Sequence, residues 1–406
     1  MAHALSINGA PSQSSSSGGR FSLFAKGFRP FFLLASVFGA LMVPLWLLAL
    51  EGVIQPASRF SPMYWHAHEM VFGFTVAVIA GFLLTAVGNW TQRETAVGTP
   101  LALLGVLWIA GRVAMSMASL LPPLVPVIVD LAFLPALAVV LARPLVATRN
   151  RRNFVMLAVL AALFAANLMT HLDTLGVAPG WQRRGALVAV DVVVLLMLII
   201  AGRVVPMFTR NATGRDGIRS IPALEALTIG LMALLTAMDA FGGLALDRAI
   251  FAVLAGLAGV VAVARAFRWG TQHVLRQPLL WILHVGYAWI PLGLLLRAAG
   301  EATGGVYSSM ATHALTAGAI GALTLGMMAR VALGHTGRPL AVGTPMVAAF
   351  AAMTLAAAIR VAAPLLPEQY LASLVFAGVL WSASFVVYAI VYAPILVTPR
   401  ADGRAG

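Results

Sequence analysis

Residues 65–89 read WHAHEMVFGFTVAVIAGFLLTAVGN and carry both the clearest signal for the fold and a first signal for chemistry. After Glu69 this stretch has no ionisable side chain, and it exceeds the roughly 20 residues that a helix needs to cross a bilayer. Similar apolar runs recur along the chain, whose 406 residues are 61% hydrophobic and only 10% charged. Soluble domains carry about 25% charged residues. The composition therefore predicts an all-α, polytopic membrane protein and argues against a soluble one.

We expect twelve spanning helices, separated by breaks that carry proline, glycine or arginine. Residues 1–27 are polar and predicted to be a disordered N-terminal tail, residues 28–398 a single transmembrane domain, and residues 399–406 a short C-terminal tail. The tail is too polar for a signal peptide, so the run from Phe28 is expected to be an uncleaved anchor. The predicted helices are 29–50, 65–89, 100–119, 123–143, 153–175, 185–205, 221–240, 248–267, 278–298, 308–331, 341–363 and 370–396.

The charge pattern predicts an orientation. Most of the 26 Lys and Arg residues lie in alternate segments between the predicted helices, beginning with the N-terminal tail. The positive-inside rule then places both termini in the cytoplasm. This placement accounts for the formal net charge of +13, so we expect no nucleic-acid partner.

The chain has no cysteine, which excludes disulfides, thiolate metal sites, iron–sulfur clusters and covalently attached haem. Any metal must be held by histidine, methionine, carboxylate or backbone groups. In the predicted topology, four histidines from three helices lie near the outer face: His66, His68, His171 and His313. Ionisable groups at such depth are costly and are kept where they pair, face a cavity or carry function. Imidazole binds zinc, copper, iron and nickel, so this grouping favours metal binding over isolated interhelical hydrogen bonds.

The spacing of residues 66–69 predicts which side chains share a helix face. Residues two apart on a helix point about 200° apart, whereas residues three apart share a face. We therefore expect His66 and Glu69 on one face and His68 on another, so that the two histidines serve two neighbouring sites, or one of them supports the other. Small residues follow the candidate ligands, and they leave room for a flat macrocycle or for close helix contact: Gly73 and Ala77 after His66, and Ala317 and Gly321 after His313.

Other polar residues within the predicted helices have more than one interpretation. Arg112 is expected to pair with Asp130 or Asp191, or with a haem propionate. His284 lies deeper than the other histidines, and we expect a hydrogen-bonded core histidine there, with metal ligation as the alternative. His335 follows the end of its predicted helix and is expected to serve the loop.

Several motifs together are similar to one known family. They are FRPFFLLA (28–35), WHAHEM (65–70), GFLLTA (81–86), LWIAGR (107–112), RNRRN (149–153), GRVVPMFTRN (202–211), HALTAGAIG (313–321) and RVALGHTGRPL (330–340). With these motifs spread over nearly its whole length, the chain resembles the NnrS family of bacterial membrane proteins.

The resemblance implies a multi-pass protein of the bacterial inner membrane that contains haem b and copper. It also implies a role in nitric oxide metabolism and in resistance to nitrosative stress in denitrifying bacteria. On this basis we expect haem to be axial to His313 and to one of His66 and His68. Copper is expected on His171 and on whichever of His66 and His68 does not bind haem. His284 is the next candidate ligand. Glu69, Asp173 and Asp191 would handle protons or support ligands, and Arg112 would meet a propionate or a carboxylate.

Several functions remain open at this stage. The protein would bind nitric oxide or reduce it, and reduction needs electrons from a quinol or a redox protein. A copper or haem transporter would use the same groups along a polar route through both leaflets. A haem-based sensor or assembly partner would bind without turnover, and a structural cluster of histidines would bind no metal. Beyond these, only membrane lipid is expected as a partner.

Overall fold

The computed structural model describes residues 21–242 and 248–404. Within these residues there are helices and no strands, and twelve helices are long and apolar enough to cross a membrane, which confirms the predicted fold class and number. Residues 1–20 of the predicted tail, and 405–406, lie outside the described residues. The spans are α1 (Phe28–Leu50), the continuous α2–η1–α3 (Pro62–Thr91), α4 (Thr99–Ser116), α5 (Leu124–Ala147), α6 (Val155–Thr174), α7 (Trp181–Thr213), α8 (Pro222–Phe241), α9 (Arg248–Ala266), α10 (Pro278–Thr303), the continuous α11–η5–α12 (Tyr307–His335), α13 (Thr344–Ala362) and α14 (Tyr370–Val397).

Proline and glycine mark many of the helix ends. Five helices, α2, α4, α8, α10 and α13, have proline in their first two positions, where the missing N–H costs nothing. Gly214 ends α7 in the left-handed region, with φ +66°, which glycine adopts without strain. This local chemistry explains why the breaks could be read from the sequence.

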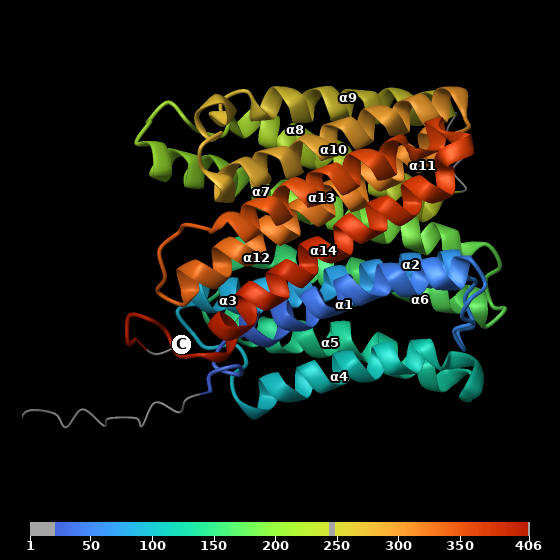
Figure 1. The fold of residues 1–406 in the computed structure, drawn as a ribbon, viewed down its shortest axis with the longest axis horizontal. Coiled ribbons are helices and arrows are strands. Elements are labelled where there is room, and N and C mark those ends of the chain that lie inside the picture. Colours follow the sequence, from blue (N-terminus) through green and yellow to red (C-terminus); the bar gives the residue numbers. More distant parts are fainter. Residues whose placement is uncertain (1–20, 243–247, 405–406) are drawn as a thin grey trace, which may run out of the picture.

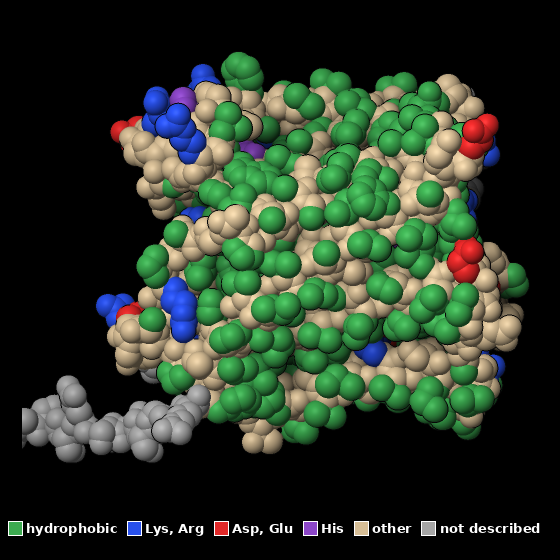
Figure 2. All heavy atoms as spheres, in the orientation of Figure 1, with side chains coloured by type: hydrophobic (Ala, Val, Ile, Leu, Met, Phe, Trp, Pro, Cys, Tyr) green, Lys and Arg blue, Asp and Glu red, His purple; other side chains and the backbone are tan. Residues whose placement is uncertain are grey.

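The first and last spans, α1 and α14, pack side by side in the bundle (Figure 1). The Ser22 N–H donates to the Val397 carbonyl at 2.8 Å, and the buried Arg29 guanidinium donates to the carbonyls of Leu396 and Thr398 at 2.9 and 2.7 Å. Figure 2 shows apolar side chains over the flank of the bundle and charged side chains mainly at its two ends. This distribution fits a surface that faces lipid, because the hydrocarbon core of a bilayer cannot solvate charged groups.

One helix is clearly longer than predicted. The sequence indicated a span over 185–205, but α7 covers Trp181–Thr213 and projects beyond its neighbours at one end of the bundle (Figure 1). Hydropathy marks where a helix leaves the membrane rather than where it ends. The polar residues before Gly214 are compatible with a helix, so α7 continues past the membrane edge.

Two spans contain a π-helical segment that the sequence did not predict. The segment η1 (Glu69–Thr75) directly follows α2 (Pro62–His68), and η5 (Ala314–Ile320) directly follows α11 (Tyr307–His313). Each π-helix thus begins immediately after a histidine that the sequence singled out. π-helical turns are rare and frequently occur at functional sites.

A buried ion pair joins α8 and α9 to α7. The Arg265 guanidinium is fully buried and donates to Glu225 Oε1 and Oε2 at 2.8 and 2.5 Å, and to the Leu198 carbonyl at 2.5 Å. A Cβ atom added at Gly202 would overlap both Arg265 and Glu225. The absence of a side chain at Gly202 therefore lets the pair lie against α7.

We expect Gly202→Ala to destabilise the protein by about 1–3 kcal/mol, because the added methyl group overpacks a site filled by an ion pair. The measurement is thermal unfolding of the purified protein in detergent. Gly230→Ala in α8 is the matched control, since a Cβ atom there meets nothing within 4 Å. Equal melting temperatures for the two variants would contradict the packing argument.

Candidate functional site

A pocket lies between the two π-helical segments, α1, α13 and α14. Its polar lining residues include His66, His313 and Arg360, and apolar side chains form most of the remaining wall. The small residues Ala317, Ala356, Ala377 and Gly378 widen it. A mostly apolar lining with a few convergent polar groups is typical of a small-molecule or cofactor site.

The hydrogen bonds of the two histidines leave ring nitrogens available. His313 Nδ1 donates to the Ser309 carbonyl at 2.8 Å, so its Nε2 keeps the lone pair. The His66 ring stacks on Trp46, with centroids 4.1 Å apart. His66 Nδ1 and Arg360 Nη1 are buried and have no hydrogen-bond partner among the described residues. Unpaired buried polar atoms are uncommon, so the pocket offers two imidazoles and a cation to a ligand.

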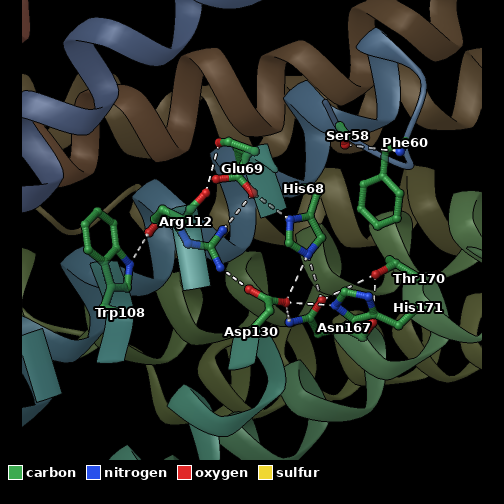
Figure 3. A network of polar contacts seen from close by, with 12 residues as sticks. Ser58, Phe60, His68, Glu69, Trp108, Arg112, Asp130, Asn167, Thr170 and His171 are labelled. Atoms are coloured by element: carbon green, nitrogen blue, oxygen red, sulfur yellow. Dashed lines mark hydrogen bonds and ion pairs between the residues drawn. The ribbon is translucent and has the colours of Figure 1, made fainter. Parts of the chain in front are cut away.

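A second cluster joins α2, α5 and α6 (Figure 3). Asp130 Oδ2 lies 2.9 Å from His171 Nε2 and 3.3 Å from His68 Nε2, and one ligand atom from each of the three residues falls within 4.8 Å of the others. All three side chains are buried. Asn167 closes the group, because its amide donates to Asp130 Oδ2 at 2.7 Å and its oxygen lies 3.0 Å from His68 Nε2.

The charges of the cluster are balanced only if one further positive charge is present. Both ring nitrogens of His68 face oxygen atoms, since Nδ1 lies 3.0 Å from Glu69 Oε1 and Nε2 faces Asn167 and Asp130. A neutral imidazole has only one N–H, so one nitrogen lone pair would then face an oxygen lone pair. The two carboxylates outnumber the single guanidinium of Arg112. A second proton on His68 or a metal cation in the cluster therefore completes the charge balance.

Arg112 of α4 binds both carboxylates. Its Nη1 donates to Glu69 Oε1 at 2.8 Å and its Nη2 to Asp130 Oδ1, and its side chain is 8% exposed. The predicted pairing with Asp130 is confirmed, whereas Glu69 was not foreseen as a partner. Arg112 does not line the pocket of His66 and His313, so the cation there is Arg360 instead.

The faces of the helix differ from the prediction in one respect. His66 and His68 do serve different groups, as expected, but Glu69 lies with His68 and not with His66. The prediction for Glu69 was wrong because the Glu69 carboxylate turns toward Arg112 of α4 and toward the neighbouring His68 ring. Of the small residues, Ala317 lines the pocket below His313, whereas Gly73 packs against Phe38 and Arg112.

Three other candidate residues lie outside both groups. Asp191 accepts from Arg297 at 2.8 Å, and Arg297 also binds Asp239, which ties α7 and α10 to α8. His284 Nε2 lies 3.0 Å from Thr209 Oγ1 and its Nδ1 lies 2.9 Å from Thr271 Oγ1. These bonds make His284 the hydrogen-bonded core histidine that the sequence favoured. Asp173 accepts from the Gln182 N–H at 2.8 Å near the start of α7.

Comparison with known proteins decides the relationship. A family model described as NnrS protein matches residues 22–400, nearly the whole chain. The chain belongs to the NnrS family. No curated protein matches it. The matched range of this NnrS-family protein includes all twelve spans and every residue of the pocket and the cluster.

Sequence reasoning missed two residues of this NnrS-family protein. Arg360 was not among the predicted site residues, yet its side chain lines the pocket. Asp130 was considered only as a partner for Arg112, yet it also joins His68 and His171. A weak signal was present in both cases, because each is an ionisable residue inside a predicted span.

Proposed function

We propose that this NnrS-family protein holds haem b in the pocket between His66 and His313. We further propose copper at the cluster of His68, Asp130 and His171, and a function in which the protein binds or reduces nitric oxide and so protects against nitrosative stress. It would do so as a multi-pass protein of the bacterial inner membrane with both termini in the cytoplasm. The observation that carries the proposal is one apolar pocket with two available imidazoles and a guanidinium that lacks a full set of partners.

The pocket suits a haem on three counts. His313 donates from Nδ1 to a backbone carbonyl, and this is the usual arrangement that fixes a ligating histidine with Nε2 free. The small residues Ala317 and Gly378 leave space along two walls for a flat ring. The unpaired N–H of Arg360 offers a partner for a propionate. These residues would hold the group, with His66 and His313 as candidate ligands to its iron.

The second cluster suits a transition metal. Metal–ligand bonds of about 2.0–2.2 Å set neighbouring ligand atoms roughly 3.3 Å apart in a tetrahedral site. The separations of 2.9 and 3.3 Å around Asp130 Oδ2 need little expansion to reach this value. Two histidines and one carboxylate also accept zinc and iron. The family relationship is the reason to propose copper among them.

The side chains have roles that follow from their contacts. Haem iron and copper, when bound, supply redox-active centres at which a diatomic ligand such as nitric oxide is held. Glu69 Oε1 accepts a hydrogen bond from His68 Nδ1 and so directs Nε2 toward Asp130. Arg112 fixes both carboxylates. Trp46, Phe74 and Trp381 line the pocket and limit the access of water.

A copper or haem transporter is the alternative. A copper ion would need polar groups along its whole route. A chamber between α3, α7 and α12 is instead lined by apolar residues and one threonine, Thr324, whose hydroxyl donates to the Ile320 carbonyl at 2.6 Å. This lining argues against a route for copper ions there. A sensor or assembly partner shares the proposed sites and differs only in lacking turnover.

The test is an optical spectrum of the purified protein, oxidised and dithionite-reduced, before and after nitric oxide, with metal analysis of the same sample. We expect a b-type haem spectrum that shifts with nitric oxide, and copper that co-purifies. His171→Gln should lower the copper content and leave the haem spectrum in place, because His171 does not line the pocket. A colourless protein that exchanges copper freely would overturn the haem proposal and support transport.

A further inference from the structure

A second cavity lies near one end of the bundle, lined by residues at the ends of α3 and α12. Figure 1 shows that these two helices end on the side where α14 ends, opposite the end where α2 begins. Residues from α3, α7, α12 and the short helix η3 (Arg151–Asn153) line the cavity. Two of them, Arg152 and Arg203, are cations, and none of the described residues that line the cavity is acidic.

These arginines have no carboxylate partner. Arg203 Nη1 donates to the neutral Asn153 side chain at 3.1 Å, and neither Arg203 nor Arg152 forms an ion pair among the described residues. A third cation, Arg330, has its guanidinium carbon 3.9 Å from the ring centroid of Phe208. Phe208 also lines the cavity. Two neighbouring guanidinium groups without an anion form a site for phosphate or carboxylate, which arginine binds with paired hydrogen bonds.

An apolar chamber lies next to this cavity. The two spaces share four lining residues, Phe82, Ile200, Val204 and Met327, so they adjoin. The chamber runs along α3 and α12 toward the middle of the membrane, and its one polar side chain, Thr324, is bonded to its own helix. A cavity lined by cations next to an apolar chamber matches a molecule with an anionic headgroup and a long apolar tail.

We infer that this composite cavity binds one anionic phospholipid, with its phosphate on Arg152 and Arg203 and an acyl chain in the apolar chamber. A free phosphate or a soluble anion would leave the chamber unused, and a zwitterionic lipid would bring a further cation to a site that already has three. Basic pockets between transmembrane helices are recognised sites for acidic headgroups. The bound lipid would fill the space between α7 and the pair α3 and α12.

The test compares lipid retained by the full-length protein after purification in mild detergent, measured by mass spectrometry of the extract. We expect the protein to retain anionic phospholipid. The double variant Arg152→Gln/Arg203→Gln should retain at least about tenfold less of it, the factor expected for losing charge-assisted hydrogen bonds. Arg151→Gln is the matched control, because Arg151 is exposed in the same segment and does not line the cavity. Val204→Phe, at the junction of the two spaces, should also lower retention while every cation stays in place.

A second arm separates the sources of the anion. The delipidated protein is melted with phosphatidylglycerol, with phosphatidylcholine or with inorganic phosphate. Stabilisation by phosphatidylglycerol alone supports the proposal. Equal stabilisation by inorganic phosphate, unchanged lipid retention in the double arginine variant, or loss of haem absorbance in that variant would each overturn it. The lipid readouts do not depend on haem or copper, so their failure is distinct from failure of the proposed function.

Discussion

His313→Ala should remove the haem absorbance of the purified protein, and His66→Ala should do the same or nearly so. Both imidazoles line one pocket, and His313 Nε2 is left free by the bond from Nδ1 to the Ser309 carbonyl. Loss of a group that merely supports a metal ligand costs about 10–100-fold in metal affinity, so loss of a ligand itself should cost at least as much. The measurement is the haem-to-protein ratio, read from the reduced spectrum.

Two histidine controls make this expectation specific. His284→Ala should keep the haem, because His284 is bonded to Thr209 and Thr271 and does not line the pocket. His68→Ala should also keep it and should lower the second metal instead, because His68 belongs to the cluster with Asp130. Haem lost in His68→Ala but retained in His313→Ala would show that the two proposed centres are assigned the wrong way round.

The sequence predicted the fold well because hydropathy and the residues that end helices are local properties. All twelve spans could be located from apolar runs, and proline or glycine marked many of their ends. Local rules also separated His66 from His68, since residues two positions apart on a helix point to opposite sides. What local rules did not give was the length of α7, whose polar end stays helical as far as Thr213.

The candidate site could be predicted only in part, because it depends on how distant helices pack. Depth in the membrane suggested that His171 and His313 lie near the first pair of histidines, but not which of them meets which. The Glu69 carboxylate lies with His68 and Arg112, and no hydropathy pattern marks a contact with a distant helix. Arg360 enters the pocket from α13, a contact between residues far apart in the chain.

Arg112→Met should destabilise the protein by about 3–5 kcal/mol, the cost of leaving buried charge without its partner. Arg112 is the cation that binds both Glu69 and Asp130, and these carboxylates are 0% and 3% exposed. The measurement is the free energy of unfolding of the purified protein in a detergent titration. Arg93→Met is the control, because Arg93 is exposed and forms no ion pair among the described residues.

Combining Arg112→Met with Glu69→Gln tests whether charge balance, rather than packing, sets this cost. In the double variant Asp130 remains opposite His68, and a protonated His68 is enough to balance it. We therefore expect the double variant to be more stable than Arg112→Met alone, although it has lost more of the original hydrogen bonds. If the two substitutions instead add, the network is held by shape and hydrogen bonding. The extra positive charge would then not be a requirement of the cluster, and the main argument for a cation beside His68 would fail.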